Sequence, residues 1–156
     1  MNFNEAVNLL LEFEGGYVDH PNDPGGITKF GISQKSYPHL DIQNLSQEEA
    51  KEIYKQDYWN KLRLDELPSF IRFSLFDCAV NQGLKFSIRS IQSIVGVKVD
   101  GVLGIQTMSA ILECKNLKQI HDDFILRRLE NYASQKNWKY FGVGWVRRLL
   151  KVALAI

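Results

Sequence analysis

The sequence has 156 residues, which suits one domain or a domain with a small appended lobe. Hydrophobic residues make up 45% of the chain and charged residues 24%, as in an ordinary globular protein that buries a core. The formal net charge of +1 argues against a nucleic-acid-binding protein, because such proteins usually carry a larger basic excess or a basic stripe.

The sequence also argues against a membrane protein. It has no apolar run of the roughly 18–20 residues that a membrane-spanning helix needs, so we expect no stable membrane insertion. The first residues lack the basic start, long apolar run and small-residue cleavage site of a secretory signal. We therefore expect a protein that is made in the cytoplasm without a signal peptide.

A predicted helix over residues 2–14 places one carboxyl group on its apolar face. Val7, Leu10 and Glu14 follow one another at helical spacing and so share that face. A carboxyl group among apolar side chains loses hydration, which disfavours its charged form and makes Glu14 a candidate general acid. The alternative is a helix-terminal glutamate that turns to solvent. The glycine pair at 15–16 favours the first interpretation, because it ends the helix and leaves Glu14 at the edge of the next loop.

The loop after this helix is rich in turn residues and carries short polar side chains. Those with candidate roles are Asp19, Asp23 and Thr28. A protonated acid facing an ionised carboxylate is the arrangement that glycoside hydrolysis uses: the first protonates the leaving oxygen, and the second stabilises positive charge, activates water or attacks. Two acidic loop residues can also bind a metal, but only His20 accompanies them and the spacing fits no calcium loop. We therefore expect no metal and no other cofactor.

Several motifs along the chain occur together in one known family. They are Glu14-Gly15-Gly16-Tyr17, Asn22 to Thr28, Phe30-Gly31-Ile32, Tyr58-Trp59, Phe76 to Gly83 and Gly142 to Trp145. In this combination the sequence resembles glycoside hydrolase family 108, whose members are N-acetylmuramidases common in phages and prophages. The resemblance spans most of the chain and implies a lysozyme-like, endolysin-like enzyme that degrades the peptidoglycan of the cell wall.

The resemblance also implies roles for individual residues. The glutamate of the family's EGGY motif is its catalytic acid, which corresponds to Glu14. Phage-type lysozymes have a similar order of Glu, Asp nine residues on and then Thr, which selects Asp23 and Thr28, with Asp19 as an alternative second carboxylate. The candidate substrate-binding residues are Tyr17, Tyr58, Trp59 and Asn81. Aromatic faces suit sugar rings, and the resemblance places Trp59 near the site.

The implied reaction is acid-catalysed cleavage of the β-1,4 bond between N-acetylmuramic acid and N-acetylglucosamine. The glycan strands of peptidoglycan are the expected partner of a monomeric enzyme, with a holin or a secretion system to give access to them in the periplasm. An alternative is a catalytically inactive cell-wall-binding or secretion-associated protein on the same scaffold. The intact set of Glu14, Asp23 and Thr28 favours the enzyme.

The middle of the chain predicts two helices. A capping box at residues 46–49 starts the first, which we expect to end at residues 58–59. Pro68 opens the second, which is apolar nearly all round and is therefore expected to be the central buried helix. Asp77 lies within it, and a buried carboxylate must be paired or hydrogen-bonded. We expect Asp77 to be a structural anchor, with Arg72 as a candidate partner.

From residue 86 onward the sequence predicts a second, helical region. An amphipathic helix over residues 86–95 precedes an Asp100-Gly101 turn, which is similar to the loop of peptidoglycan-binding helical modules. A long helix over about 117–136 follows. The aromatic residues and glycines at 138–145 predict a sharp turn, and the basic cluster around Arg148 is expected on a solvated helix face.

Together these elements predict a mainly α-helical fold. We expect a lysozyme-like α+β body over residues 1–85, with a short β-hairpin and the catalytic loop. A helical C-terminal lobe over residues 86–156, resembling a peptidoglycan-binding module, is expected to pack with this body as one unit.

Overall fold

The computed structural model describes residues 1–14 and 27–155. In chain order they form α1 (Phe3–Glu14), β1 (Thr28–Lys29), β2 (Ile32–Ser33), α2 (Gln47–Tyr54), a π-helix (Lys55–Trp59), a 3-10 helix (Leu64–Glu66), α3 (Ser69–Gln82), α4 (Leu84–Ile94), α5 (Ile105–Leu112), α6 (Leu117–Ala133) and α7 (Trp138–Leu154). The expected mainly α-helical fold class is confirmed, with a β-hairpin at the expected place. The candidate residues Tyr17, Asp19 and Asp23 lie outside the described residues.

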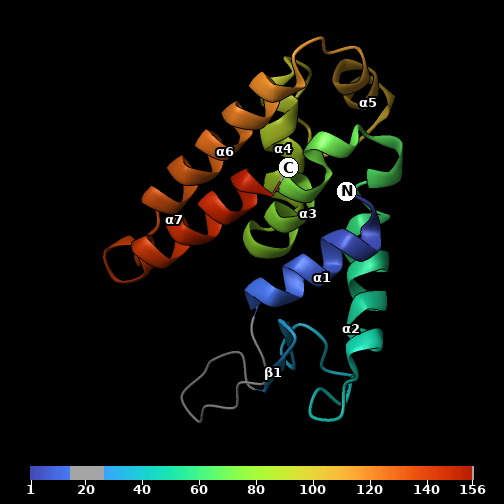
Figure 1. Ribbon diagram of the computed structural model, residues 1–156, viewed down its shortest axis with the longest axis vertical. Coiled ribbons are helices and arrows are strands. Elements are labelled where there is room, and N and C mark those ends of the chain that lie inside the picture. The colour runs from blue at the N-terminus through green and yellow to red at the C-terminus, as the bar shows by residue number, and fades with distance from the viewer. Residues whose placement is uncertain (15–26, 156) are drawn as a thin grey trace.

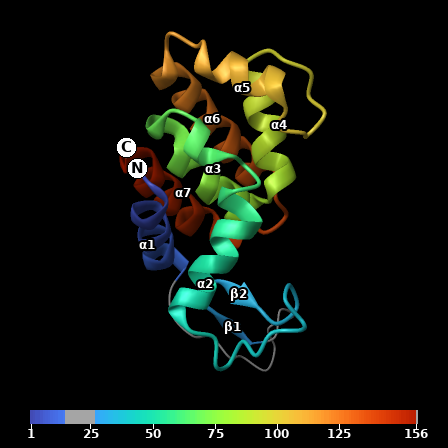
Figure 2. The same ribbon diagram turned by 90° about the vertical axis from the view of Figure 1, so that its right-hand side faces the viewer.

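Helix α3 forms the centre of the molecule, as its sequence predicts. It is apolar nearly all round, and the side chains of Phe73, Leu75 and Phe76 are almost completely buried. Helices α1, α4, α6 and α7 all pack against it. In Figures 1 and 2, α1, α2 and the hairpin gather at one end of the molecule and α4, α5 and α6 at the other, with α3 between them. Residues from both ends therefore meet around α3.

The β-hairpin turns through two residues that both have positive φ. Its register pairs Thr28 with Ser33 and Lys29 with Ile32. The turn residues Phe30 and Gly31 have φ of 52° and 78°, as tight hairpin turns of the type I′ class require. The hydroxyl of Tyr54 donates to the carbonyl oxygen of Phe30 at 2.8 Å. This hydrogen bond fastens the turn to the end of α2.

Helix α2 begins with the predicted capping box and runs into a π-helix that the sequence pattern does not reveal. The Ser46 hydroxyl accepts from the Glu49 N–H at 3.2 Å, and the Glu49 carboxylate accepts from the Ser46 N–H at 2.8 Å. At the other end, the N–H of Asn60 donates to the carbonyl of Lys55 at 2.8 Å, five residues back.

The π-helix places Trp59 in the core, so the prediction that Trp59 lines a substrate groove is wrong. Its side chain is 0% exposed, and its ring lies 5.4 Å from the rings of both Phe3 and Phe76. Tyr54 packs on the same Phe76 ring. In a regular α-helix, residues five apart point about 140° away from each other. The wider turn brings positions 54 and 59 onto one face and buries both rings.

The turn at residues 100–104 is closed by a hydrogen bond to Asp100, and a buried glutamine reinforces it. The Asp100 carboxylate accepts from the Val102 N–H at 2.9 Å. Gln92 of α4 is 1% exposed; its amide donates to Asp100 at 2.8 Å and its carbonyl oxygen accepts from the Gly101 N–H at 2.8 Å. The turn is thereby tied to α4 whether or not this lobe touches a cell wall.

Two further sequence interpretations concern the organisation of the chain. Helix α4 begins at Leu84, so the predicted division between residues 85 and 86 falls in its first turn and stays a prediction. Within residues 1–14 and 27–155, no helix has the length and apolar character needed to cross a membrane.

The aromatic stretch at residues 138–145 is helical, so the predicted turn is wrong. It forms the first half of α7, which packs beside α6. Position 142 of this helix favours glycine because the Trp138 ring lies close to it. A Cβ at this position would lie 2.8 Å from Cδ2 of that ring. Gly144 has open space where a Cβ would point. The two glycines that suggest a turn in the sequence therefore both lie inside one helix. Gly142 is packed against a ring, and Gly144 is not.

We predict opposite effects of alanine at these two glycines. Gly144→Ala gains helix propensity and is expected to stabilise the protein by up to about 1 kcal/mol. Gly142→Ala gains the same propensity but forces the Trp138 ring aside, an overpacking cost of about 1–3 kcal/mol. Urea unfolding of both variants measures the difference. A Gly142→Ala variant as stable as Gly144→Ala would show that the contact imposes no constraint.

Candidate active site

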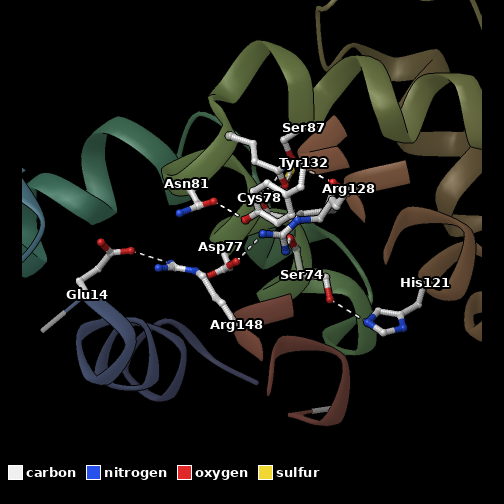
Figure 3. Close-up of polar contacts among 12 residues, drawn as sticks. Glu14, Ser74, Asp77, Cys78, Asn81, Ser87, His121, Arg128, Tyr132 and Arg148 are labelled. Carbon is white, nitrogen blue, oxygen red and sulfur yellow. Dashed lines mark hydrogen bonds and ion pairs between the residues drawn. The ribbon is translucent and has the colours of Figure 1, made fainter. Parts of the chain in front are cut away.

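Glu14 is the last residue of α1, and its side chain is only 18% exposed. One carboxylate oxygen, Oε1, accepts a hydrogen bond from Nη2 of Arg148 at 2.6 Å. Arg148 belongs to α7, so the contact joins segments at opposite ends of the chain (Figure 3). The apolar face predicted for α1 does end at Glu14, but a guanidinium occupies the space beside its carboxylate.

Arg148 also binds Asp77, the buried carboxylate of α3. Its Nη2 and Nε donate to Oδ1 of Asp77 at 2.6 and 3.1 Å. The second oxygen of Asp77 accepts from Nη2 of Arg128, in α6, at 2.6 Å. Asp77 and Arg128 are both 0% exposed. The result is a row of alternating charges in the order Glu14, Arg148, Asp77 and Arg128, which Figure 3 shows from left to right.

This row is electrically balanced, since two guanidinium groups face two carboxylates. Burial disfavours the charged guanidinium of Arg148, but the attraction of Asp77 and then of Glu14 raises the pKa of Arg148 above its ordinary value. Arg128 gains a further partner in Gln82, whose amide oxygen accepts from its Nε at 2.7 Å. The donors and acceptors of the network therefore satisfy one another, as a buried network requires.

The hairpin turn closes over the other side of Glu14. A Cβ at Gly31 would lie 3.0 Å from Cγ of Glu14, 3.1 Å from its Oε2 and 2.5 Å from the Tyr54 hydroxyl oxygen. Only glycine fits between these two side chains. The positive φ of Gly31 also favours glycine at this position. Burial, and after it the negative charge of Glu14, raise the pKa of Tyr54, so this hydroxyl keeps its proton and its bond to Phe30.

A pocket of about 380 Å³ lies beside this arrangement. Its lining includes Arg148, which contacts Glu14, and Phe13, which precedes Glu14 in the chain, together with Asn81 and Trp145. The size is suitable for part of a ligand rather than a polymer. Glu14 is thus a carboxylate held between a hairpin turn and a buried ion network, and its partner Arg148 lines a surface pocket.

The structure places the other predicted site residues as follows. Thr28 is half-buried in β1, two residues before the turn that contacts Glu14. Tyr58 is half-buried beside Tyr54, with ring centroids 5.9 Å apart. Asn81 is exposed at the end of α3. Their binding roles stay predictions.

Two expectations about charged residues are wrong. Arg72 is not the partner of Asp77; it donates to the backbone carbonyls of Leu67 and Asp65 instead. Arg148 is not on a solvated face, because its side chain is 14% exposed and contacts Glu14. The pattern of buried residues in α7, such as Leu149 and Val152, does not reveal that Arg148 contacts Glu14. Glu14 lies 134 residues away from Arg148 in the chain.

The described residues contain no group of three or more His, Cys, Asp or Glu side chains able to hold a metal ion. His121 and its two acidic neighbours illustrate this: the ring is buried and its Nε2 lies 2.8 Å from the Ser74 hydroxyl. At Glu14 the described residues supply a carboxylate and the guanidinium of Arg148 that hydrogen-bonds to it.

Comparison with known proteins agrees with this chemistry. A family model described as Glycosyl hydrolase 108 matches residues 7–83. The structure of SagA from Brucella abortus is similar to this one, with 31% sequence identity, 97% of this chain and 91% of that chain covered, and a TM-score of 0.87. No curated protein matches the sequence. The family and the fold indicate a glycoside hydrolase. The chain belongs to glycosyl hydrolase family 108, which indicates an enzyme that acts on peptidoglycan.

We predict that the centre of the ion network dominates local stability. Asp77→Asn removes one charge and leaves Arg128 buried without a counter-ion, which should lower the free energy of unfolding by about 3–5 kcal/mol. Glu66→Gln removes the same type of charge from the exposed pair with Arg63 and should change it by less than about 1 kcal/mol. Chemical denaturation measures both variants. Equal, small losses would mean that the buried network is dispensable.

Proposed function

We propose that the protein is an N-acetylmuramidase, a lysozyme, in which Glu14 is the general acid. The reaction is hydrolysis of the β-1,4 bond between N-acetylmuramic acid and N-acetylglucosamine in peptidoglycan. The observation that carries the proposal is the placement of Glu14. It is a largely buried carboxylate that hydrogen-bonds to Arg148 and lies against the hairpin turn. Arg148 lines a surface pocket, and the chain belongs to a glycoside hydrolase family.

The charge row suits a group that must gain and lose a proton. In the acid step, a protonated Glu14 donates its proton to the glycosidic oxygen of the leaving sugar. When Glu14 is neutral, Arg148 keeps its hydrogen bonds from Nε and Nη2 to the Asp77 carboxylate, although the row then carries one positive charge in excess. The guanidinium therefore stays in place through the cycle. Its role is to hold the Glu14 carboxyl group in one orientation, which favours proton transfer to a fixed position.

The second carboxylate and the water belong to the same proposal. Asp23, with Asp19 as the alternative, stabilises the oxocarbenium-like transition state or activates water, and Thr28 positions that water. Both aspartates lie outside the described residues; Thr28 leads directly into the turn that contacts Glu14. The separation of the two carboxyl groups then decides between inversion and retention.

Substrate contacts are proposed for Tyr17, Tyr58 and Asn81. Asn81 has the most direct support, because it lines the pocket that Arg148 also lines. We further propose that the enzyme acts as a monomer on peptidoglycan in the periplasm, after release by a holin or export by a secretion system.

The test is wall lysis with and without the acid. Wild-type protein is expected to clear a suspension of purified Gram-negative peptidoglycan and to release fragments with N-acetylmuramic acid at the reducing end. Glu14→Gln keeps the shape and the contact with Arg148 but has no proton to give, so the rate should fall by about 10²–10⁴-fold.

Glu113→Gln is the matched control, since Glu113 is an exposed glutamate at the end of α5. It should lyse walls at the wild-type rate. Turbidity loss and mass spectrometry of the fragments are the readouts. Undiminished lysis by Glu14→Gln would refute the assignment of the acid, and wall binding without any fragments from wild type would point to an inactive scaffold.

A further inference from the structure

A second, larger pocket of about 740 Å³ lies where the end of α3 meets the turn between α6 and α7. Its lining is dominated by carboxamide side chains, those of Asn81, Gln82, Asn131, Gln135 and Asn137. We call it the carboxamide pocket. Tyr132 and Trp145 give it an aromatic wall, with their rings stacked at a centroid distance of 5.2 Å and an angle of 24°. None of the described residues that line it is acidic.

Some of these carboxamide side chains hydrogen-bond to other parts of the protein, and others have donors and acceptors that can bind a ligand. Gln82 is engaged by Arg128 on both atoms of its amide. The Asn81 oxygen accepts from the Tyr132 hydroxyl, as Figure 3 shows, so its NH₂ group points to other partners. Within the described part of the chain, the side chains of Asn131 and Asn137 make no hydrogen bond. Each offers a donor and an acceptor on one rigid group.

The carboxamide pocket adjoins the smaller pocket that Arg148 lines. Asn81 and Trp145 line both pockets, and Arg148 lines the smaller one. Arg148 in turn contacts Glu14 at 2.6 Å. Shared lining residues therefore connect the carboxamide pocket to the pocket beside Arg148, and we infer that a polymer whose reacting bond lies at Glu14 follows this direction.

We propose that the carboxamide pocket binds an N-acetylated sugar of the glycan strand, beyond the bond that is cleaved. The proposal rests on the proposed function, because it takes Glu14 as the position of that bond. Sugar hydroxyl and acetamido groups both donate and accept, which carboxamides match one for one. The apolar face of a pyranose ring suits the aromatic wall. Asn131 and Asn137 are the specificity-determining residues.

The charges of the pocket favour a sugar over the peptide stems, the other component of peptidoglycan. Stems carry carboxylates and amines, so a pocket that selects them would present both positive and negative side chains. Lys136 is the only charged residue among the described residues that line the pocket. A neutral, hydrogen-bonding ligand fits this lining better.

The experiment measures strand affinity in the Glu14→Gln background, where cleavage is suppressed. Isothermal titration calorimetry is run with two probes: glycan strands freed of peptide by an amidase, and strands that keep their stems. Asn131→Ala combined with Asn137→Ala should weaken binding of the peptide-free strands by about tenfold. The control is Gln106→Ala, an exposed carboxamide on α5, which should bind as the parent does.

Each other outcome overturns the proposal. A loss confined to stem-bearing strands assigns the pocket to the peptide, and unchanged affinity for the peptide-free strands removes it from the binding surface. Failure of the parent to bind peptide-free strands does the same. Thermal unfolding checks the fold, and Asn137→Ser alone serves if the double variant unfolds. Lysis by the wild-type protein is measured separately. A wild-type protein that binds strands but does not lyse walls would refute the muramidase assignment, while the proposal that the carboxamide pocket binds a sugar would stand.

Discussion

The guanidinium of Arg148 is shared between Glu14, at the end of α1, and Asp77, in the middle of α3, so three helices meet at one cation. Burying these charges costs hydration, which only complete pairing offsets. Arg128 completes the pairing on the far side of Asp77. The orientation of Glu14 is therefore set by a network that reaches through the central helix, and the end of α1 cannot move without disturbing it.

The candidate active site that results has a rigid side and an open side. On the rigid side, Gly31 and the Tyr54 hydroxyl close against Glu14 with no room for another atom. On the open side, Arg148 lines a pocket together with Asn81 and Trp145, and these two residues also line the carboxamide pocket. A glycan strand needs both features. The acid must be held still at one bond, while neighbouring sugars must find hydrogen-bonding groups along the way.

Sequence patterns predicted most of the helices, the capping box at residues 46–49 and the membership of the family, because these depend on local spacing or contiguous motifs. They failed where one residue depends on a distant partner or on unusual geometry. Arg148 resembles any basic residue of a surface helix until α3 and α7 are packed together. Trp59 is buried because of a π-helix that no periodicity reveals, and Gly142 resembles a turn residue until the Trp138 ring is in place. Glu14 could be proposed as the acid from the sequence, but its contact with Arg148 could not be predicted.

The most direct test of this account is a crystal structure of Glu14→Gln with a peptide-free glycan strand of six or more sugars. The account predicts a glycosidic oxygen within about 3 Å of the side chain of residue 14, with Arg148 still bound to Asp77. It also predicts that the strand continues towards Trp145. A strand bound with residue 14 remote from every glycosidic oxygen would contradict the assignment of Glu14 as the acid.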